Sequence, residues 1–153
     1  MVVEPKSQEL SAGILYEKAH VQPTNDLKSL LWYSKGGTIE WVVGYTAWIG
    51  KTVQMHVARM GEYKYTPKPL IYAAFDYPFN KYGVDIIFGV VNSMNTNALE
   101  FDQKLGFKEK IRWNGMHDDG GHLILLILPP VLEVTQLTSY SLLKIYLRIT
   151  CRI

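Results

Sequence analysis

The sequence predicts an α+β fold, with a mixed but mostly antiparallel sheet and helices that flank it. Between about residues 30 and 58, three strand-like segments separated by glycine-containing turns, the last with alternating apolar and polar residues, predict a meander of antiparallel strands. Residues 66–91 have a helical period followed by an apolar, β-branched run, which predicts a crossover helix and a buried parallel strand. A second helix and a final hairpin follow, up to residue 128.

The N-terminal part is predicted to contain strands and turns. Residues Ile14–Val21 have mixed strand character, and Pro23–Asp26 is a turn or the start of a short helix. Leu30–Ser34 is predicted to be a short strand, and Thr38–Trp48 a long one, since the longer segment is rich in β-branched and aromatic residues. The Gly36-Gly37 pair between them is typical of a hairpin turn.

The next strand, Thr52–Ala58, has the clearest alternation. One face carries apolar side chains and the other polar ones, in the order Val53, Met55, Val57 against Thr52, Gln54, His56. Together with the two preceding strands it completes a three-stranded antiparallel meander.

A crossover unit follows the meander. Thr66-Pro67 is predicted to be an N-cap followed by proline at the first helical position. Pro78 is expected to kink or end this helix, and Gly83 to close it. The apolar run Val84–Val91 is predicted to be a parallel strand, reached by a right-handed crossover. The helical stripe consists of Ile71, Ala74, Phe75 and Pro78.

The last predicted elements are a helix and a hairpin. The helix covers about Asn95–Leu105, and Gly106 follows it as the left-handed cap. Phe107–Trp113 and His122–Leu128 are predicted to pair across a turn that contains Asp-Gly. The apolar tail beyond Pro130 fits either a strand pair or a docked helix.

Length and composition favour one domain. The chain has 153 residues, 48% of them hydrophobic, which is enough for one packed core. We predict a single domain over residues 1–153, with a recognisable core at about 30–128 and an unassigned extension at 129–153. The formal net charge is +2 with both signs scattered, so charge gives no argument for nucleic acid binding.

The sequence also favours a cytoplasmic location. Cys151 is the only cysteine, so an internal disulfide is excluded and a reducing compartment is expected. The N-terminal residues lack the apolar stretch of a signal peptide. The longest apolar run, Leu123–Leu132, is too short to span a bilayer and is interrupted by prolines.

The most specific motif lies at the second helix. Asn95 and Ala98 form an N-x-x-A pattern, and the helix ends in Lys104-Leu105-Gly106-Phe107. With the order of the other elements, this stretch resembles the acyl-CoA-binding strand and helix of the GNAT superfamily, the acyl-CoA-dependent N-acetyltransferases. The strand residues Met55-His56-Val57-Ala58 also make the chain similar to small members encoded by phages and prophages, and a phage-encoded protein would lie in the host cytoplasm.

The resemblance implies a twisted sheet with a splayed parallel pair and acetyl-CoA as the acyl donor. It implies that Val57, Ala58, Asn95 and Ala98 bind the donor, because the family's fourth strand and this helix do so. The pyrophosphate of the donor is expected to bind at a helix N-terminus, held by Lys64, Tyr65 and Thr66. The expected partners are acyl-CoA and an amine-bearing acceptor, with a homodimer as an open alternative.

The sequence departs from the family pattern at two places. The glycine-rich pyrophosphate loop is replaced by Arg59–Pro67 with one glycine, and Pro67 and Pro69 remove two amides that could bind phosphate. Asp102 stands where many members have a tyrosine that protonates the CoA thiolate. An aspartate with a pKa near 3.9 is ionised at pH 7 and donates a proton only if burial raises that pKa strongly.

Two residues are candidate general bases. His56 has an ordinary pKa near 6.5, which suits proton removal from an amine near neutrality. Glu40 on the neighbouring strand is the alternative. Either residue also fits a simpler role, as a half-exposed strand side chain or a solvated carboxylate. The His117–His122 segment, with two carboxylates between its histidines, fits a hairpin turn better than a metal site.

The sequence leaves three alternative hypotheses about function. The first is acyl transfer from acyl-CoA to an amine. The second is a GNAT-like binding module without catalysis, which the altered phosphate loop and Asp102 favour. The third is a phage-type enzyme that modifies DNA bases or a host protein, against which the low net charge argues.

Overall fold

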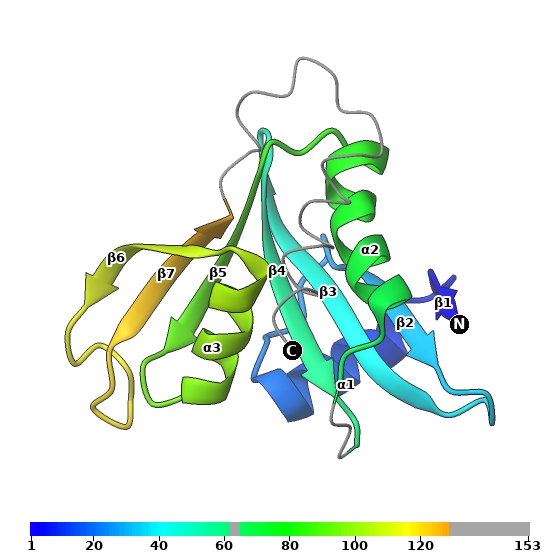
Figure 1. Cartoon of the computed structure of the whole chain (residues 1–153), viewed down its shortest axis with the longest axis horizontal. Coiled ribbons are helices and arrows are strands. Elements are labelled where there is room, and N and C mark those ends of the chain that lie inside the picture. Colours follow the sequence, from blue (N-terminus) through cyan, green and yellow to red (C-terminus); the bar gives the residue numbers. More distant parts are fainter. Residues whose placement is uncertain (62–64, 129–153) are drawn as a thin grey trace. The chain divides into compact units, whose positions relative to one another are not determined.

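The computed structural model describes residues 1–61 and 65–128 (Figure 1). The elements are β1 (Val2–Val3), α1 (Glu9–Ala19), β2 (Lys28–Tyr33), β3 (Ile39–Ile49), β4 (Thr52–Arg59), α2 (Lys68–Asp76), the π-helical turn η1 (Tyr77–Lys81), β5 (Ile86–Asn92), α3 (Thr96–Leu105), β6 (Lys108–Trp113) and β7 (Leu123–Leu128). None of the described helices is long and apolar enough to cross a membrane.

The strands of the first unit described below lie in the order β1-β2-β3-β4, those of the second in the order β5-β7-β6, and all pair antiparallel, with helices beside them. This confirms the predicted α+β fold class. The chain divides into two compact units, Met1–Val84 and Asp85–Ile153. That the chain is a single domain, and that its crossover is right-handed, stay predictions. The extension at 129–153 lies outside the described residues.

The first unit contains the predicted meander. β2, β3 and β4 pair antiparallel in sequence order, and β1 adds a short edge strand against β2. The amide of Ser34 donates a hydrogen bond to the carbonyl of Thr38 and closes the hairpin. Gly37 has a φ of 81°, a backbone conformation that is strained for residues with a side chain. The three predicted strands and the turn between the first two are therefore confirmed.

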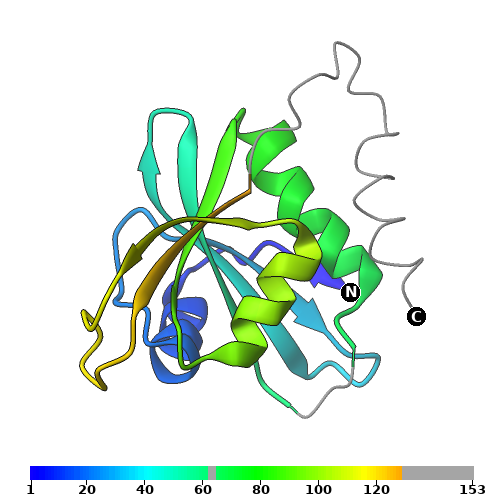
Figure 2. The same cartoon turned by 60° about the vertical axis from the view of Figure 1, so that its left-hand side comes forward.

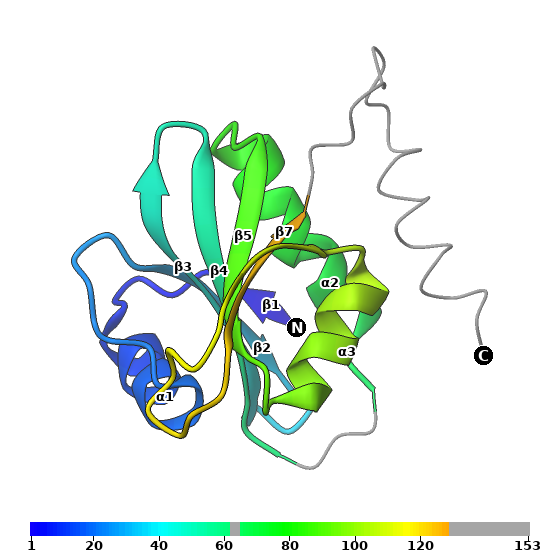
Figure 3. The same ribbon diagram turned by 90° about the vertical axis from the view of Figure 1, so that its left-hand side faces the viewer.

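The two helices of the first unit cover opposite faces of this sheet (Figure 3). On one face α1 comes so close to β3 that a Cβ on Gly44 would lie 2.4 Å from a methyl carbon of Leu15. On the other face the buried hydroxyl of Tyr45 donates a hydrogen bond to the carbonyl of Ala74 in α2 at 2.7 Å. Consecutive strand residues point to opposite faces, so these contacts define an α1 face and an α2 face.

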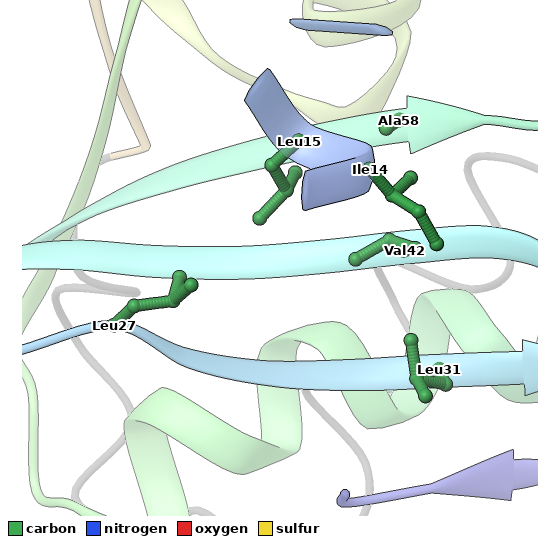
Figure 4. Packing of buried hydrophobic residues seen from close by; sticks show 6 residues of the cluster. All are labelled: Ile14, Leu15, Leu27, Leu31, Val42 and Ala58. Carbon is green, nitrogen blue, oxygen red and sulfur yellow. The ribbon is translucent and has the colours of Figure 1, made fainter. Parts of the chain in front are cut away.

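The α1 face carries a compact apolar core. Figure 4 shows its side chains, which come from α1, the strand β2 with the residue before it, β3 and β4. Burying such side chains contributes roughly 1.5–3 kcal/mol each relative to leaving them exposed. The cluster consists of Ile14, Leu15, Leu27, Leu31, Val42 and Ala58.

The strand predicted for Ile14–Val21 is wrong, because the segment belongs to α1 up to Ala19 and leaves the helix after it. Ser11, Ile14 and Leu15 are buried at a helical spacing, and the chain leaves the helix at His20 in a left-handed conformation. The apolar residues of the segment gave an ambiguous period. Packing of one helical face on the sheet decided between strand and helix.

The predicted crossover helix forms with shifted ends. Pro67 rather than Thr66 is the N-cap, and the helix begins at Lys68. Leu70 is almost fully buried and joins the stripe in place of Ile71, which is partly exposed. Pro78 does not end the helical segment, because the chain continues through η1 as a π-helical turn up to Lys81.

The second unit contains β5, β7 and β6, paired antiparallel in that order, and α3 beside them (Figure 2). Asn95, at the predicted start of this helix, is the N-cap of α3. At the other end Gly106 has a φ of 101°, and the amides of Gly106 and Phe107 bond back to the last turn. The predicted second helix and final hairpin are confirmed.

Candidate functional site

His56 lies on the α1 face of β4. Its strand partner is Gly44, which faces Leu15 of α1, and two residues further on Ala58 pairs with Val42 in the core. Residues that are directly opposite in an antiparallel pair point to the same side. The polar side of β4 that the sequence predicted therefore faces α1, beside the apolar cluster.

The imidazole of His56 makes one close polar contact. Its Nε2 lies 2.8 Å from Oγ1 of Thr46, whose side chain is buried. Burial lowers the pKa of His56 from 6.5 to about 4, because the charged form loses its hydration. The expectation of a pKa near 6.5 is therefore wrong for the folded protein, and His56 is neutral at pH 7.

Glu40 is engaged elsewhere. Its Oε2 accepts a hydrogen bond from the indole N–H of Trp32 at 3.1 Å, and its backbone carbonyl accepts from the amide of Met60. Glu40 precedes Gly44, the strand partner of His56, by four residues. That separation is about 13 Å along the strand, so the structure does not bring the two candidate bases together.

The end of β4 and the start of α2 carry the expected donor-binding residues of the first unit. Ala58 is buried in the core, whereas Val57 on the other face is partly exposed. Tyr65 is exposed, and Thr66 is partly exposed. Lys64 lies outside the described residues.

The N-terminus of α2 offers few free amides. Pro67 and Pro69 have no N–H, and the amide of Leu70 already bonds to the carbonyl of Pro67 at 3.0 Å. An anion at this helix end would therefore depend on the partial charge of the helix and on nearby cations more than on backbone hydrogen bonds.

In the second unit, Asn95 is the N-cap of α3. Its Oδ1 accepts a hydrogen bond from the amide of Ala98 at 3.1 Å, and its side chain is exposed. Because the helix uses only the oxygen of this amide, the Nδ2 group is left to donate to a ligand. Ala98, the second residue of the motif, is partly buried.

Asp102 lies on α3, seven residues after Asn95 and so on nearly the same helix face. Burial raises the pKa of its carboxyl from 3.8 to about 6, because the ionised form is poorly solvated there. The condition under which an aspartate can donate a proton near neutrality is thus partly met. At pH 6 about half of the Asp102 side chains carry the proton.

Comparison with solved structures identifies the fold. The spermidine/spermine N-acetyltransferase SpeG from Vibrio cholerae superposes with a TM-score of 0.65 at 13% sequence identity, over 84% of this chain and 91% of that chain. A candidate phosphinothricin N-acetyltransferase superposes with a TM-score of 0.68 at 15% identity, over 85% of this chain and 98% of that chain. This chain has an N-acetyltransferase fold. The sequence itself matches no family model and no curated protein.

Within this N-acetyltransferase fold, the histidine-rich segment forms a hydrogen-bonded turn. His117 pairs with Asp119 at 2.9 Å, and Asp119 also accepts the amide of Gly121 at 2.8 Å. Asn92 donates to the other oxygen of Asp119, which ties the turn to the end of β5. Over residues 1–61 and 65–128, no group of three or more His, Cys, Asp or Glu side chains could hold a metal ion.

Sequence reasoning missed Thr46. A threonine in the middle of β3 has the pattern of an ordinary strand residue, and nothing in the sequence distinguishes it. Its contact with His56 follows from the register of β3 against β4, which places Thr46 opposite Gln54 and diagonal to the histidine. Only the paired strands reveal this neighbour.

Proposed function

We propose that this protein is an acyltransferase that moves an acetyl group from acetyl-CoA to an amine. The observation that carries the proposal is the fold, which N-acetyltransferases share over 84–85% of the chain. One of these neighbours is named a spermidine/spermine N-acetyltransferase, but for this chain we propose only that the acceptor is an amine.

The chemistry needs two proton transfers. The neutral amine nitrogen forms a bond to the thioester carbonyl carbon, and the nitrogen loses a proton as this bond forms. The C–S bond then breaks, and the departing thiolate takes up a proton. A residue that accepts the first proton and another that supplies the second would each contribute roughly 10²–10⁴-fold.

We assign the first transfer to His56. Because its pKa is about 4, the imidazole is unprotonated at pH 7 and has a free lone pair. It is a weak base, but the acidity of the amine rises steeply once nitrogen bonds to carbon, so a weak base suffices at that stage. Glu40, held by Trp32, is the less favoured base.

We assign the second transfer to Asp102. With a pKa of about 6, a fraction of its carboxyl is protonated near neutrality and can donate to the thiolate. Asn95 would donate through Nδ2 to the acyl donor, with Ala98 beside it on the same helix. Val57, Ala58 and the Lys64–Thr66 segment would complete the donor site, as the family resemblance implies.

A binding module without catalysis is the second candidate. The proline-rich start of α2 favours it, because two phosphate-binding amides are absent there. The phage-type origin, the cytoplasmic location, the homodimer and the modification of DNA or a host protein stay predictions.

Calorimetric titration with acetyl-CoA tests the proposal. A dissociation constant in the micromolar range, followed by release of free thiol when a panel of primary amines is added, would support acyl transfer. Binding without thiol release would favour the binding module. The absence of heat at millimolar acetyl-CoA would exclude both roles for the donor site.

A further inference from the structure

The contact between Thr46 and His56 determines which nitrogen of the histidine can act as a base. A neutral imidazole has one N–H and one lone pair, and the partner of one nitrogen decides where the hydrogen lies. Nε2 lies 2.8 Å from Oγ1 of Thr46, and among the described residues Nδ1 has no hydrogen-bond partner. The lone pair is useful for proton transfer only if it is on Nδ1.

Thr46 is the polar contact of the His56 imidazole because of how the residues around the ring are arranged. Gly44, directly opposite His56, has no side chain, and Leu15 of α1 fills the space above it. The imidazole therefore meets the diagonal neighbour Thr46, which long side chains can reach in an antiparallel pair. With an exposed fraction of 5%, Thr46 does not exchange this contact freely for water.

A strained bulge holds Thr46 in place. The register of β3 and β4 shifts between Thr46 and Ile49, and Ala47 has a φ of 51°, which is uncommon for a residue with a side chain. Asp26 stabilises the bulge, because its carboxylate accepts a hydrogen bond from the amide of Trp48 at 3.3 Å. A bulge next to a functional residue commonly serves to aim a side chain.

We propose that Thr46 is a positioning residue that accepts a hydrogen bond from Nε2–H of His56 and so leaves Nδ1 as the basic atom. This inference rests on the proposed acyl transfer. When Nδ1 takes the proton from the amine, Nε2 keeps its hydrogen, and the bond to Thr46 persists. An arrangement in which Thr46 donated to Nε2 would have to break during each turnover.

Nitrogen NMR tests the tautomer without any substrate. Two-bond ¹H–¹⁵N correlation spectra distinguish a ring nitrogen that carries hydrogen from one with a lone pair. The chain has four histidines, and the spectrum of His56→Gln assigns the signals of His56 by their loss. We expect Nδ1 to have the lone pair at pH 7 in the parent, and a mixture of tautomers in Thr46→Val. An Nδ1–H tautomer in the parent would overturn the proposal.

Turnover provides the second readout. Thr46→Val should lower turnover about three- to tenfold, the range expected for one lost hydrogen bond, with the KM for acetyl-CoA unchanged. Thr46→Ser, which keeps the hydroxyl, should restore turnover to within about twofold. Thr52→Val is the matched control, because the Thr52 hydroxyl bonds to the carbonyl of Ile49 and not to a histidine. Thermal unfolding of each variant checks that it is folded.

The outcomes separate this inference from the proposed function. If His56→Gln lowers turnover and Thr46→Val does not, Thr46 has no positioning role although the acyltransferase proposal stands. If the parent releases no thiol with any amine, the acyltransferase proposal fails, and the base role of Nδ1 fails with it. Equal loss in the valine and serine variants would indicate a packing role and contradict the hydrogen bond.

Discussion

His56 in the first unit and Asp102 in the second are both removed from water, and burial changes their pKa values in opposite directions. The pKa of His56 falls to about 4 and that of Asp102 rises to about 6. The physical cause is the same, because a poorly hydrated site favours whichever form is neutral. Desolvation by itself therefore favours a neutral imidazole at one site and a protonated carboxyl at the other, without a charged partner for either.

The two residues make opposite contributions to stability as the pH changes. The raised pKa of Asp102 stabilises the fold below about pH 4, and this contribution is lost as the pH rises through 6. The lowered pKa of His56 stabilises the fold above about pH 6.5, and this contribution is lost as the pH falls towards 4. Between about pH 4 and pH 6.5 the stability contribution of Asp102 falls with rising pH while that of His56 grows, so the two changes partly cancel. A variant that removes one residue should therefore expose the pH dependence of stability caused by the other.

The largest effect is expected for Asp102→Asn. The rise of the pKa from 3.8 to about 6 corresponds to a cost of about 3 kcal/mol at pH 7. The amide has no such cost, so the free energy of unfolding should increase by up to about 3 kcal/mol at pH 7–8 and stay nearly unchanged near pH 3. Urea titrations over this pH range measure it.

The same variant tests the proton donor. Parent turnover should fall as the pH rises above about 6, because the protonated fraction of Asp102 falls, and Asp102→Asn should be slower with a flatter profile. Asp118→Asn, in the exposed turn, is the control. A parent profile that is flat between pH 5 and 8 would exclude Asp102 as the acid.

The next effect is that of His56→Gln. If His56 accepts the proton of the amine, turnover should fall at least tenfold while the affinity for acetyl-CoA stays nearly unchanged. Because the pKa of His56 is about 4, no rise in rate through pH 6–7.5 is expected from this residue. Steady-state kinetics and calorimetry measure both quantities.

His20→Asn is the control for this variant, because His20 is an exposed histidine at the end of α1. Full turnover in His56→Gln would leave His56 as a partly buried strand residue that bonds to Thr46. Proton removal would then belong to Glu40 or to water.

A smaller effect is expected for Asn95→Ala. Loss of an N-cap costs about 1 kcal/mol of stability, whereas the lost Nδ2 donor should weaken acetyl-CoA binding about tenfold. Calorimetry and thermal unfolding compare the two losses. Asn97→Ala, in the first turn of the same helix, is the control. Equal affinity in Asn95→Ala and the parent would make Asn95 a cap only.

The smallest effect is expected for Glu40→Gln. Since Trp32 can still donate to the amide oxygen, stability should stay within about 1 kcal/mol and turnover within about threefold of the parent. Steady-state kinetics measures the turnover. A tenfold loss of turnover in Glu40→Gln would assign the base role to Glu40 instead of His56. The contrast between the partly buried His56 and Asp102 would then no longer describe the proton acceptor and the proton donor.

Regular patterns made most of the fold predictable. The alternating strand Thr52–Ala58, the apolar run that became β5 and the Asn95-to-Gly106 helix with its glycine cap all formed as predicted. Each of these segments has local signals that agree with its final environment. The segment from Ile14 lacked such agreement, because its apolar residues fit two periods and only packing on the sheet chose the helix.

Local sequence patterns were enough to predict the strand order of the meander, the approximate ends of α3 and the residue types available for proton transfer. These follow from side-chain period, turn chemistry and capping, which act over a few residues. The tertiary structure decided how those residues ionise and what they contact. Thr46 meets His56 only because two strands pair in one register, and the pKa values of His56 and Asp102 depend on how far folding removes each group from water.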